Sequence, residues 1–157
     1  MINNDVLRSI RYTLDLSDNM VVDIITLAQP VNRVDAALVH DLLRKDDDPL
    51  FIECPDLMLA VFLDGLIFHF RGRDESRPAR PPEKHMTNNI VLKKLRVAFE
   101  LKDVDMHEIF ELAGFPVSKP ELSALFRQPG HKNYRACGDQ LLRNVLKGLA
   151  LRVRGNN

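Results

Sequence analysis

The residues of this chain that could do chemistry are two cysteines, five histidines and a run of three aspartates. His131, Cys137 and Asp139 come nearest to a catalytic set, but the histidines form no i, i+4 pair and no HExxH motif. The run Asp46–Asp48 lacks the spaced ligands and the central glycine of a calcium loop. We therefore expect no catalytic, cofactor-binding or metal-binding residues, and we interpret Cys54 and Cys137 as small buried thiols.

The composition of the chain argues against several other classes of protein. It has 157 residues, of which 45% are hydrophobic and 28% are charged, so it can bury a core and should be globular. Its seven glycines form no phosphate-binding loop, and its two cysteines are too few for a disulfide scaffold or a four-cysteine zinc site. No apolar run reaches the roughly 18 residues that span a bilayer, and the first residues lack a signal-peptide pattern. We expect a cytoplasmic protein with no membrane partner.

The chain contains an internal repeat. The segment Asn3–Arg11 returns as Asn88–Arg96, with an Asn-Asn pair, a Val-Leu pair and a final arginine in the same places. A Cys-x-Asp motif and a Leu-x-Gly-Leu motif also occur twice and in the same order, beginning at Cys54 and Cys137 and at Leu63 and Leu146. Several ordered blocks of this kind indicate a tandem duplication.

The duplication predicts the domain organisation. We expect an acidic helical repeat over residues 3–72 and a basic one over 88–155, joined by a proline-rich, charged linker over 73–87. Within each repeat, apolar residues recur at helical spacing in four segments, and no stretch alternates as a strand would. The predicted fold is all-α, a tandem duplication of a roughly four-helix module. Because a module of about 70 residues has a small core, we expect the two copies to pack together.

Polar residues near the starts of these segments are typical of helix caps. Asn4 and Asn89 stand before the first apolar stripe of each repeat and are predicted N-caps. A capping-box pattern, in which two side chains bond each other's backbone amides, occurs twice in the second repeat, at Ser118 with Glu121 and at Asp105 with Glu108.

Charged residues that both repeats keep predict one ion pair in each. Arg11 and Arg96 lie one turn after a leucine of the first helix, and Asp56 and Asp139 open the last helix. We predict an ion pair of Arg11 with Asp56 and another of Arg96 with Asp139. The alternative is that each aspartate only stabilises the N-terminus of its own helix.

The charges are divided unequally between the repeats. Residues 1–72 contain six Lys or Arg and twelve Asp or Glu, a net charge of −6, whereas residues 88–157 contain twelve and seven, a net charge of +5. A net charge of zero for the whole chain thus hides a strong asymmetry. Three explanations compete: the halves attract each other within one chain, they attract each other head-to-tail between chains, or the basic half binds an anion.

A basic loop makes the third explanation concrete. Lys132, Tyr134 and Arg135 precede the last helix of the second repeat, and Lys93 and Lys94 lie on its first helix. Basic side chains interleaved with an aromatic ring near helix N-termini suit phosphate binding. We predict that these five residues contact an anionic partner, either a nucleic acid or an acidic protein surface.

The paired Asn-Asn-x-Val-Leu openings and the segment His131–Gln140, His-Lys-Asn-Tyr-Arg-Ala-Cys-Gly-Asp-Gln, resemble the YehS-like family of bacterial proteins. The resemblance covers essentially the whole chain. It implies a small bacterial cytoplasmic protein with two copies of one helical module of unknown function. It implies no reaction, cofactor or catalytic residue, and the first repeat lacks the His-Lys-Asn-Tyr stretch.

These observations favour a non-enzymatic binding or regulatory protein that uses a basic surface of the second repeat. The alternative is a scaffold that forms a homo-oligomer through its opposed acidic and basic halves. An enzyme is the third and least favoured hypothesis, because the sequence contains no catalytic motif.

Overall fold

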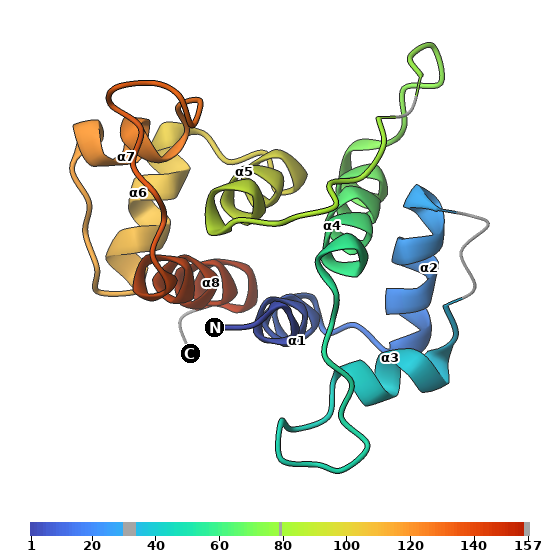
Figure 1. The fold of residues 1–157 in the computed structure, drawn as a ribbon. Helices are drawn as coiled ribbons and strands as arrows, with labels where there is room; N and C mark the ends of the chain where they lie inside the picture. The colour runs from blue at the N-terminus through green and yellow to red at the C-terminus, as the bar shows by residue number, and fades with distance from the viewer. Residues whose placement is uncertain (30–33, 79, 156–157) are drawn as a thin grey trace. The chain divides into compact units, whose positions relative to one another are not determined.

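The computed structural model describes residues 1–29, 34–78 and 80–155, and within them the chain is helical (Figure 1). It divides into two compact units, Met1–Met86 and Thr87–Asn157. Each unit contains four α-helices and no strand among its described residues. The prediction of an all-α tandem fold built from two four-helix modules is confirmed.

The four helices of each unit follow one another in the same order and with closely similar lengths. In the first unit they are α1 (Asn3–Leu14), α2 (Asp18–Ala28), α3 (Ala36–Leu42) and α4 (Asp56–Arg71). In the second unit they are α5 (Asn88–Ala98), α6 (Asp103–Leu112), α7 (Lys119–Leu125) and α8 (Asp139–Arg154).

The core of each unit is centred on its long last helix. The apolar stripe of α4 packs against α2, and that of α8 packs against α6. Gly65 lies where α4 meets α2, and a Cβ atom there would collide with the backbone carbonyl of Ile24. Gly148 lies in the same way against Ile109. The glycine of the repeated Leu-x-Gly-Leu motif is therefore required by the close approach of two helices.

Of the predicted helix caps, one capping box is confirmed and one is wrong. Ser118 and Glu121 form theirs at the start of α7, where the Glu121 N–H donates to Ser118 Oγ at 3.2 Å. At the start of α6 the capping partner of Asp105 is Lys102, whose backbone N–H donates to Asp105 Oδ2 at 2.8 Å. Because α6 begins at Asp103, Asp105 is the third residue of the helix and bonds backward, away from Glu108.

The prediction that Asn4 and Asn89 are N-caps is also wrong. The caps of α1 and α5 are Ile2 and Thr87, so each asparagine is the second residue of its helix. The Thr87 hydroxyl accepts a hydrogen bond from the Ile90 N–H at 3.2 Å and satisfies that end of α5. The two asparagines are thereby left to bond elsewhere.

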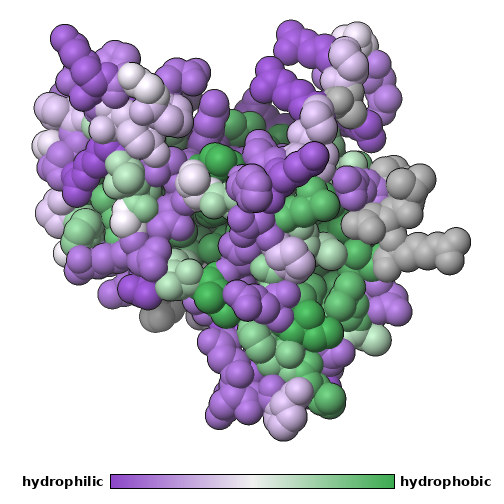
Figure 2. All heavy atoms as spheres, viewed as in Figure 1, coloured by the Kyte–Doolittle hydropathy of each residue, from purple (hydrophilic) through white to green (hydrophobic). Residues whose placement is uncertain are grey.

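The surfaces of the two units differ in character. Large hydrophobic side chains of the first unit, among them Leu50, Ile52 and Leu57, are more than 40% exposed. Figure 2 shows hydrophobic residues gathered over α3 and α4 on the face that it draws. Among the described residues of the second unit, the large exposed hydrophobic ones are three valines, and charged residues predominate. In the part of the chain that the structure describes, no helix is long and apolar enough to cross a membrane.

Candidate anion-binding site in the second unit

An asparagine on the first helix of each unit fixes the loop between the third and fourth helices. In the first unit, Asn4 Nδ2 donates to the carbonyl oxygens of Leu42 at 2.8 Å and Ile52 at 2.9 Å. Its Oδ1 accepts from the Cys54 N–H at 2.8 Å. One side chain thus joins the end of α3, the end of the loop and the residues before α4, using two donors and one acceptor.

Asn89 makes the same three bonds in the second unit. Its Nδ2 donates to the carbonyl oxygens of Leu125 at 3.0 Å and Arg135 at 2.9 Å, and its Oδ1 accepts from the Cys137 N–H at 2.8 Å. Leu125 is thereby the counterpart of Leu42, and Arg135 is the counterpart of Ile52. The two loops can be compared residue by residue, because each has nine residues between these anchors.

The ion pairs predicted for Arg11 with Asp56 and for Arg96 with Asp139 are not formed. Asp56 Oδ1 accepts from Asn3 Nδ2 at 2.7 Å, and Asp139 Oδ1 accepts from Asn88 Nδ2 at 2.8 Å. These amide donors are the first cause that lowers the pKa of each carboxyl.

The two arginines of the predicted pairs lie elsewhere. The Arg96 guanidinium bonds Asp103 at 2.6 Å, and it also lies over the ring of Phe126, 4.6 Å from its centroid. Arg11 is exposed at the C-terminal end of α1. Sequence spacing alone missed the short asparagine side chains, which reach the aspartates first.

Cys54 and Cys137 are buried, 2% and 6% exposed. Burial raises the pKa of the Cys54 thiol to about 12 and that of the Cys137 thiol to about 11. Each thiol is therefore protonated near neutral pH, when it is a poor nucleophile. His131 Nδ1 accepts from the Asn133 N–H at 3.0 Å, so that nitrogen supports a turn of the loop.

The backbones of the two loops are closely alike. In the first unit the Asp48 N–H donates to the Lys45 carbonyl at 3.0 Å, and in the second the His131 N–H donates to the Gln128 carbonyl at 2.9 Å. His131 also repeats the local role of Asp48, whose Oδ1 accepts from the Leu50 N–H at 2.8 Å. An imidazole nitrogen thus replaces one carboxylate oxygen without a change in the path of the loop.

Two arginines of the first unit, one on α1 and one at the start of the loop, form ion pairs with aspartates. Arg8 on α1 bonds Asp5 at 2.6 Å and Asp46 at 3.0 Å. Arg44, at the start of the loop, bonds Asp41 at 2.8 Å and Asp48 at 3.1 Å. Both arginines are mostly covered, and four carboxylates surround them.

The second unit keeps the cations and lacks these carboxylates. Lys93 is the counterpart of Arg8, and Arg127 is the counterpart of Arg44. At the places of the four aspartates stand four residues without a carboxylate, Ile90, Ala124, Pro129 and His131. Among the described residues, neither Lys93 nor Arg127 makes a hydrogen bond or an ion pair, and both are exposed.

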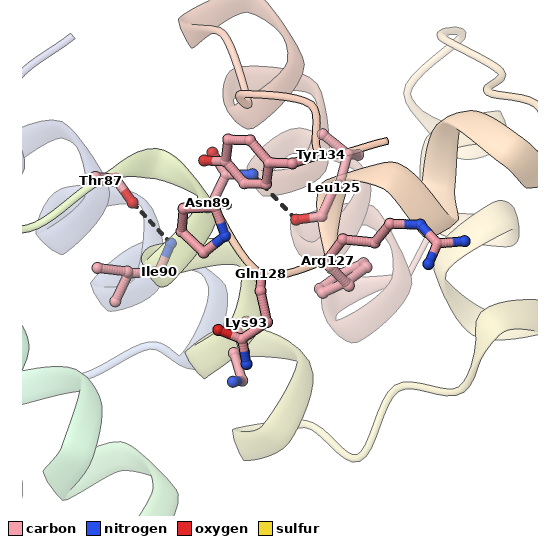
Figure 3. A pocket seen from close by; sticks show the side chains of 10 residues that line it. Thr87, Asn89, Ile90, Lys93, Leu125, Arg127, Gln128 and Tyr134 are labelled. Atoms are coloured by element: carbon pink, nitrogen blue, oxygen red, sulfur yellow. Dashed lines mark hydrogen bonds between the residues drawn. The ribbon is translucent and has the colours of Figure 1, made fainter. Parts of the chain in front are cut away.

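A pocket of about 270 Å³ lies between these two cations (Figure 3). Lys93 comes from α5 and Arg127 from the loop after α7, and their side chains end apart from one another. The other lining residues are mainly apolar or uncharged, namely Thr87, Asn89, Ile90, Leu125, Phe126, Gln128, Pro129 and Tyr134. The pocket therefore combines an apolar interior with positive charge from two directions.

The structure brings two of the five predicted contact residues, Lys93 and Tyr134, to this pocket. Lys132 lies on the exposed part of the loop outside the pocket lining, and Lys94 is half-buried on α5. The Arg135 guanidinium bonds Glu121 at 2.8 Å, so its charge is already paired.

Sequence reasoning missed Arg127 and Gln128. The signal that could have found Arg127 is the alignment of the two repeats, in which its counterpart Arg44 has aspartates around it and Arg127 has none.

Comparison with known proteins gives a family but no activity. A family model described as "Protein of unknown function (DUF1456)" matches the chain twice, over residues 3–72 and 88–155. The chain is 49% identical over 152 residues to the uncharacterized protein YehS of Escherichia coli (strain K12), which covers 97% of this chain and 96% of that protein. No solved structure matches the chain.

Proposed function

The chain belongs to the DUF1456 family, as its resemblance to YehS-like proteins predicted, and we propose that its second unit is a non-enzymatic module that binds an anionic partner. The proposed partner is a nucleic acid, and the alternative is an acidic protein surface. We place this activity in the cytoplasm. The binding site is the pocket between Lys93 and Arg127.

One observation carries the proposal. The same two positions are occupied by paired arginines in the first unit and by unpaired cations in the second. A ligand that binds Lys93 and Arg127 has no internal ion pair to displace, and the net charge of +5 around them attracts anions over a longer range.

The chemistry of the neighbouring groups supports binding over catalysis. The Cys137 thiol is buried with a pKa of about 11, and His131 Nδ1 is engaged within its own loop. A catalytic role would need a titratable group within reach of the ligand in a reactive protonation state. The pocket lining offers cations, amides and apolar side chains.

The test is binding of a fluorescent single-stranded oligonucleotide, followed by anisotropy at increasing salt concentration. We expect the affinity to fall as salt rises, with a slope near −0.7 for each phosphate contacted. The double variant Lys93→Glu/Arg127→Glu should bind at least roughly ten-fold more weakly, because two attractions become repulsions. Equal affinity of this variant and the wild type would refute the proposed site.

The matched control is Lys119→Glu/Lys147→Glu. Both lysines are exposed on the second unit and lie outside the pocket lining, so the net charge changes by the same amount. We expect a much smaller loss of affinity from this control, since only the long-range attraction is reduced. A loss equal to that of the pocket variant would show that net charge, and no defined site, governs binding.

A second candidate is self-association through the opposed charges of the two repeats. It is favoured by the net charges of −6 and +5 in the two halves of the chain. Sedimentation at low and high salt tests it, because head-to-tail contacts between exposed charges weaken with screening. A monomer at low salt and high protein concentration would eliminate this assembly.

A further inference from the structure

We infer that the pocket of the second unit takes one nucleotide of a single-stranded nucleic acid, with the base inside and the flanking phosphates on Lys93 and Arg127. This inference rests on the proposed function and specifies its ligand. It is carried by the size of the pocket, its aromatic and amide side chains and the separation of its two cations.

The size and lining of the pocket suit a flat, uncharged group. Its volume of about 270 Å³ lies just below the range for drug-sized ligands and suits a smaller group. Ile90, Leu125 and Pro129 supply apolar surface. A carboxylate side chain of an acidic peptide would bring a charge but little apolar area to fill this space. A nucleobase brings a planar body, and its phosphate stays outside.

Tyr134 supplies an aromatic face. Its ring lines the pocket and is half-buried, and its backbone N–H donates to the His131 carbonyl at 3.0 Å, which fixes the residue in the loop. Aromatic rings in such positions stack with the bases of unpaired strands, and stacking tolerates every base because each has a π face. Bases within a duplex are already stacked on one another, so entry into the pocket favours a single strand.

Gln128 supplies the polar group of the lining that is best placed to recognise a base. Its side-chain amide makes no hydrogen bond with the described residues and carries both donors and an acceptor. Asn89, the other amide in the lining, already uses its Oδ1 and Nδ2 to fix the loop. Gln128 can therefore meet the hydrogen-bonding edge of a base, whereas Asn89 has a structural role.

The placement of the cations favours a strand over an isolated phosphate. Lys93 and Arg127 stand on different walls, and their side chains end apart from one another (Figure 3). One phosphate group would reach only one of them directly. Successive phosphates on either side of an inserted nucleotide can reach both, since a strand carries a charge at every residue.

The experiment compares four probes with the wild-type protein at one salt concentration. They are a ten-nucleotide single strand, the same strand with abasic sites, its duplex, and polyglutamate. We expect the intact single strand to bind roughly ten-fold more tightly than the abasic strand, because the abasic strand keeps its phosphates and loses base stacking. The duplex and polyglutamate should also bind more weakly than the intact strand.

Variants test the two side chains that recognise the base. Tyr134→Ala should weaken binding of the intact strand roughly ten-fold and leave the abasic strand unaffected, whereas Tyr134→Phe keeps the ring and should bind like the wild type. Gln128→Ala should weaken the intact strand several-fold. Phe51→Ala and Lys45→Ala change the counterparts in the first unit and should leave affinity unchanged.

The outcomes separate this inference from the proposed function. If the abasic strand, the duplex or polyglutamate binds as tightly as the intact strand while Lys93→Glu/Arg127→Glu still abolishes binding, the anion site stands and the nucleotide pocket is refuted. If the charge variant changes the binding of no probe, both fall. Unchanged binding of the abasic strand by Tyr134→Ala distinguishes a missing ring from a missing fold, because a misfolded variant would lose both strands.

Discussion

The loop after α3 and the loop after α7 share a backbone and differ in how they treat a cation. In the first unit Arg44 is enclosed by Asp41 and Asp48, and in the second its counterpart Arg127 is exposed beside neutral residues. Since both loops keep the same backbone hydrogen bonds, the ion pairs are not needed to form the loop. The cation at this position can therefore bind a ligand in place of internal carboxylates without any change in the loop backbone.

What the two units share is a frame of uncharged contacts. Asn4 and Asn89 bond three backbone groups each, and Gly65 and Gly148 allow two helices to approach closely. Such contacts depend on shape and on buried hydrogen bonds, which tolerate little change. We therefore expect substitutions of these asparagines and glycines to lower the stability of both units. Substitutions of the charged residues around the loops should affect ligand binding, and only in the second unit.

The largest effect is expected from Gly65→Ala and Gly148→Ala. An added Cβ would collide with the backbone carbonyl of Ile24 or Ile109, and a backbone atom cannot move aside without separating the helices. Each variant should lose about 3 kcal/mol in the free energy of unfolding measured with urea. Gly130→Ala is the control, because nothing lies near its added Cβ. A mild effect at one of the two helix crossings would contradict a shared frame.

Asn4→Ala should have the next largest effect. The Asn4 side chain is fully buried, and its loss leaves the carbonyls of Leu42 and Ile52 and the N–H of Cys54 without their partner. We expect a loss of about 2 kcal/mol in the free energy of unfolding, from urea titration, because unpaired buried polar groups are costly.

Asn89→Ala and Asn144→Ala complete this series. Asn89 is only half-buried, so water can replace part of its bonds, and its variant should lose less than that of Asn4. Asn144 is also half-buried but bonds only the Gln140 carbonyl of its own helix, and its variant should be close to the wild type. An Asn144 variant as unstable as the Asn4 variant would show that these amides have no special structural role.

The frame was largely predictable from the sequence, and its fine contacts were not. Hydrophobic spacing predicts the helices, because each must bury an apolar stripe, and the repeated blocks predict that the same four helices occur twice. The partners of Asn4 lie far along the chain, and a local pattern cannot distinguish a helix cap from a tertiary bond. The same limit applies to Arg11 and Asp56, which share a unit without pairing.

The candidate site was predictable only in part, for a different physical reason. Lys93 and Tyr134 were found because positive and aromatic residues can be recognised by type. Arg127 was missed because its distinction is the loss of carboxylates around it, which appears only when the repeats are compared position by position. Arg135 was included for its charge, although Glu121 neutralises it in space.

Restoring the carboxylates of the first unit to the second should weaken binding while the fold persists. In the variant Ala124→Asp/His131→Asp, Arg127 gains the two partners that Arg44 has. We expect roughly ten-fold weaker binding of the single strand, equivalent to about 1.4 kcal/mol, because the ligand must then displace internal ion pairs. The anisotropy assay measures the loss, and circular dichroism checks that the helices remain.

The reverse change provides the control. Asp41→Ala/Asp48→His in the first unit removes the partners of Arg44 and leaves the second unit unchanged. Binding through the second unit should be retained, and stability should fall only slightly, since ion pairs that are partly open to solvent contribute little. If restoring the aspartates to the second unit leaves affinity intact, the pairing of Arg127 does not control ligand access.

The smallest effect is a dependence of stability on acid that belongs to the first loop. The Leu50 N–H, followed by the Arg44 guanidinium, lowers the pKa of the Asp48 carboxyl in the folded state. A carboxyl whose pKa is lower when folded stabilises the protein above its unfolded pKa, near 4, and this contribution is lost as the pH falls through the folded value. Asp48→Asn keeps an acceptor for Leu50 and loses the charge. In urea titrations it should be less stable than the wild type at pH 7, and the difference should shrink as the pH falls below about 4.

Asp47→Asn is the matched change for this prediction. Asp47 neighbours Asp48 in the same acidic run, is exposed, and makes no ion pair with the described residues. Its variant should follow the wild type across the whole pH range. A pH-independent difference for Asp48→Asn would mean that the carboxylate charge does not stabilise the loop. The presence of His131 in the second unit, where the first has Asp48, would then make no difference to electrostatic stability. The two loops would differ only in the exposure of Arg127.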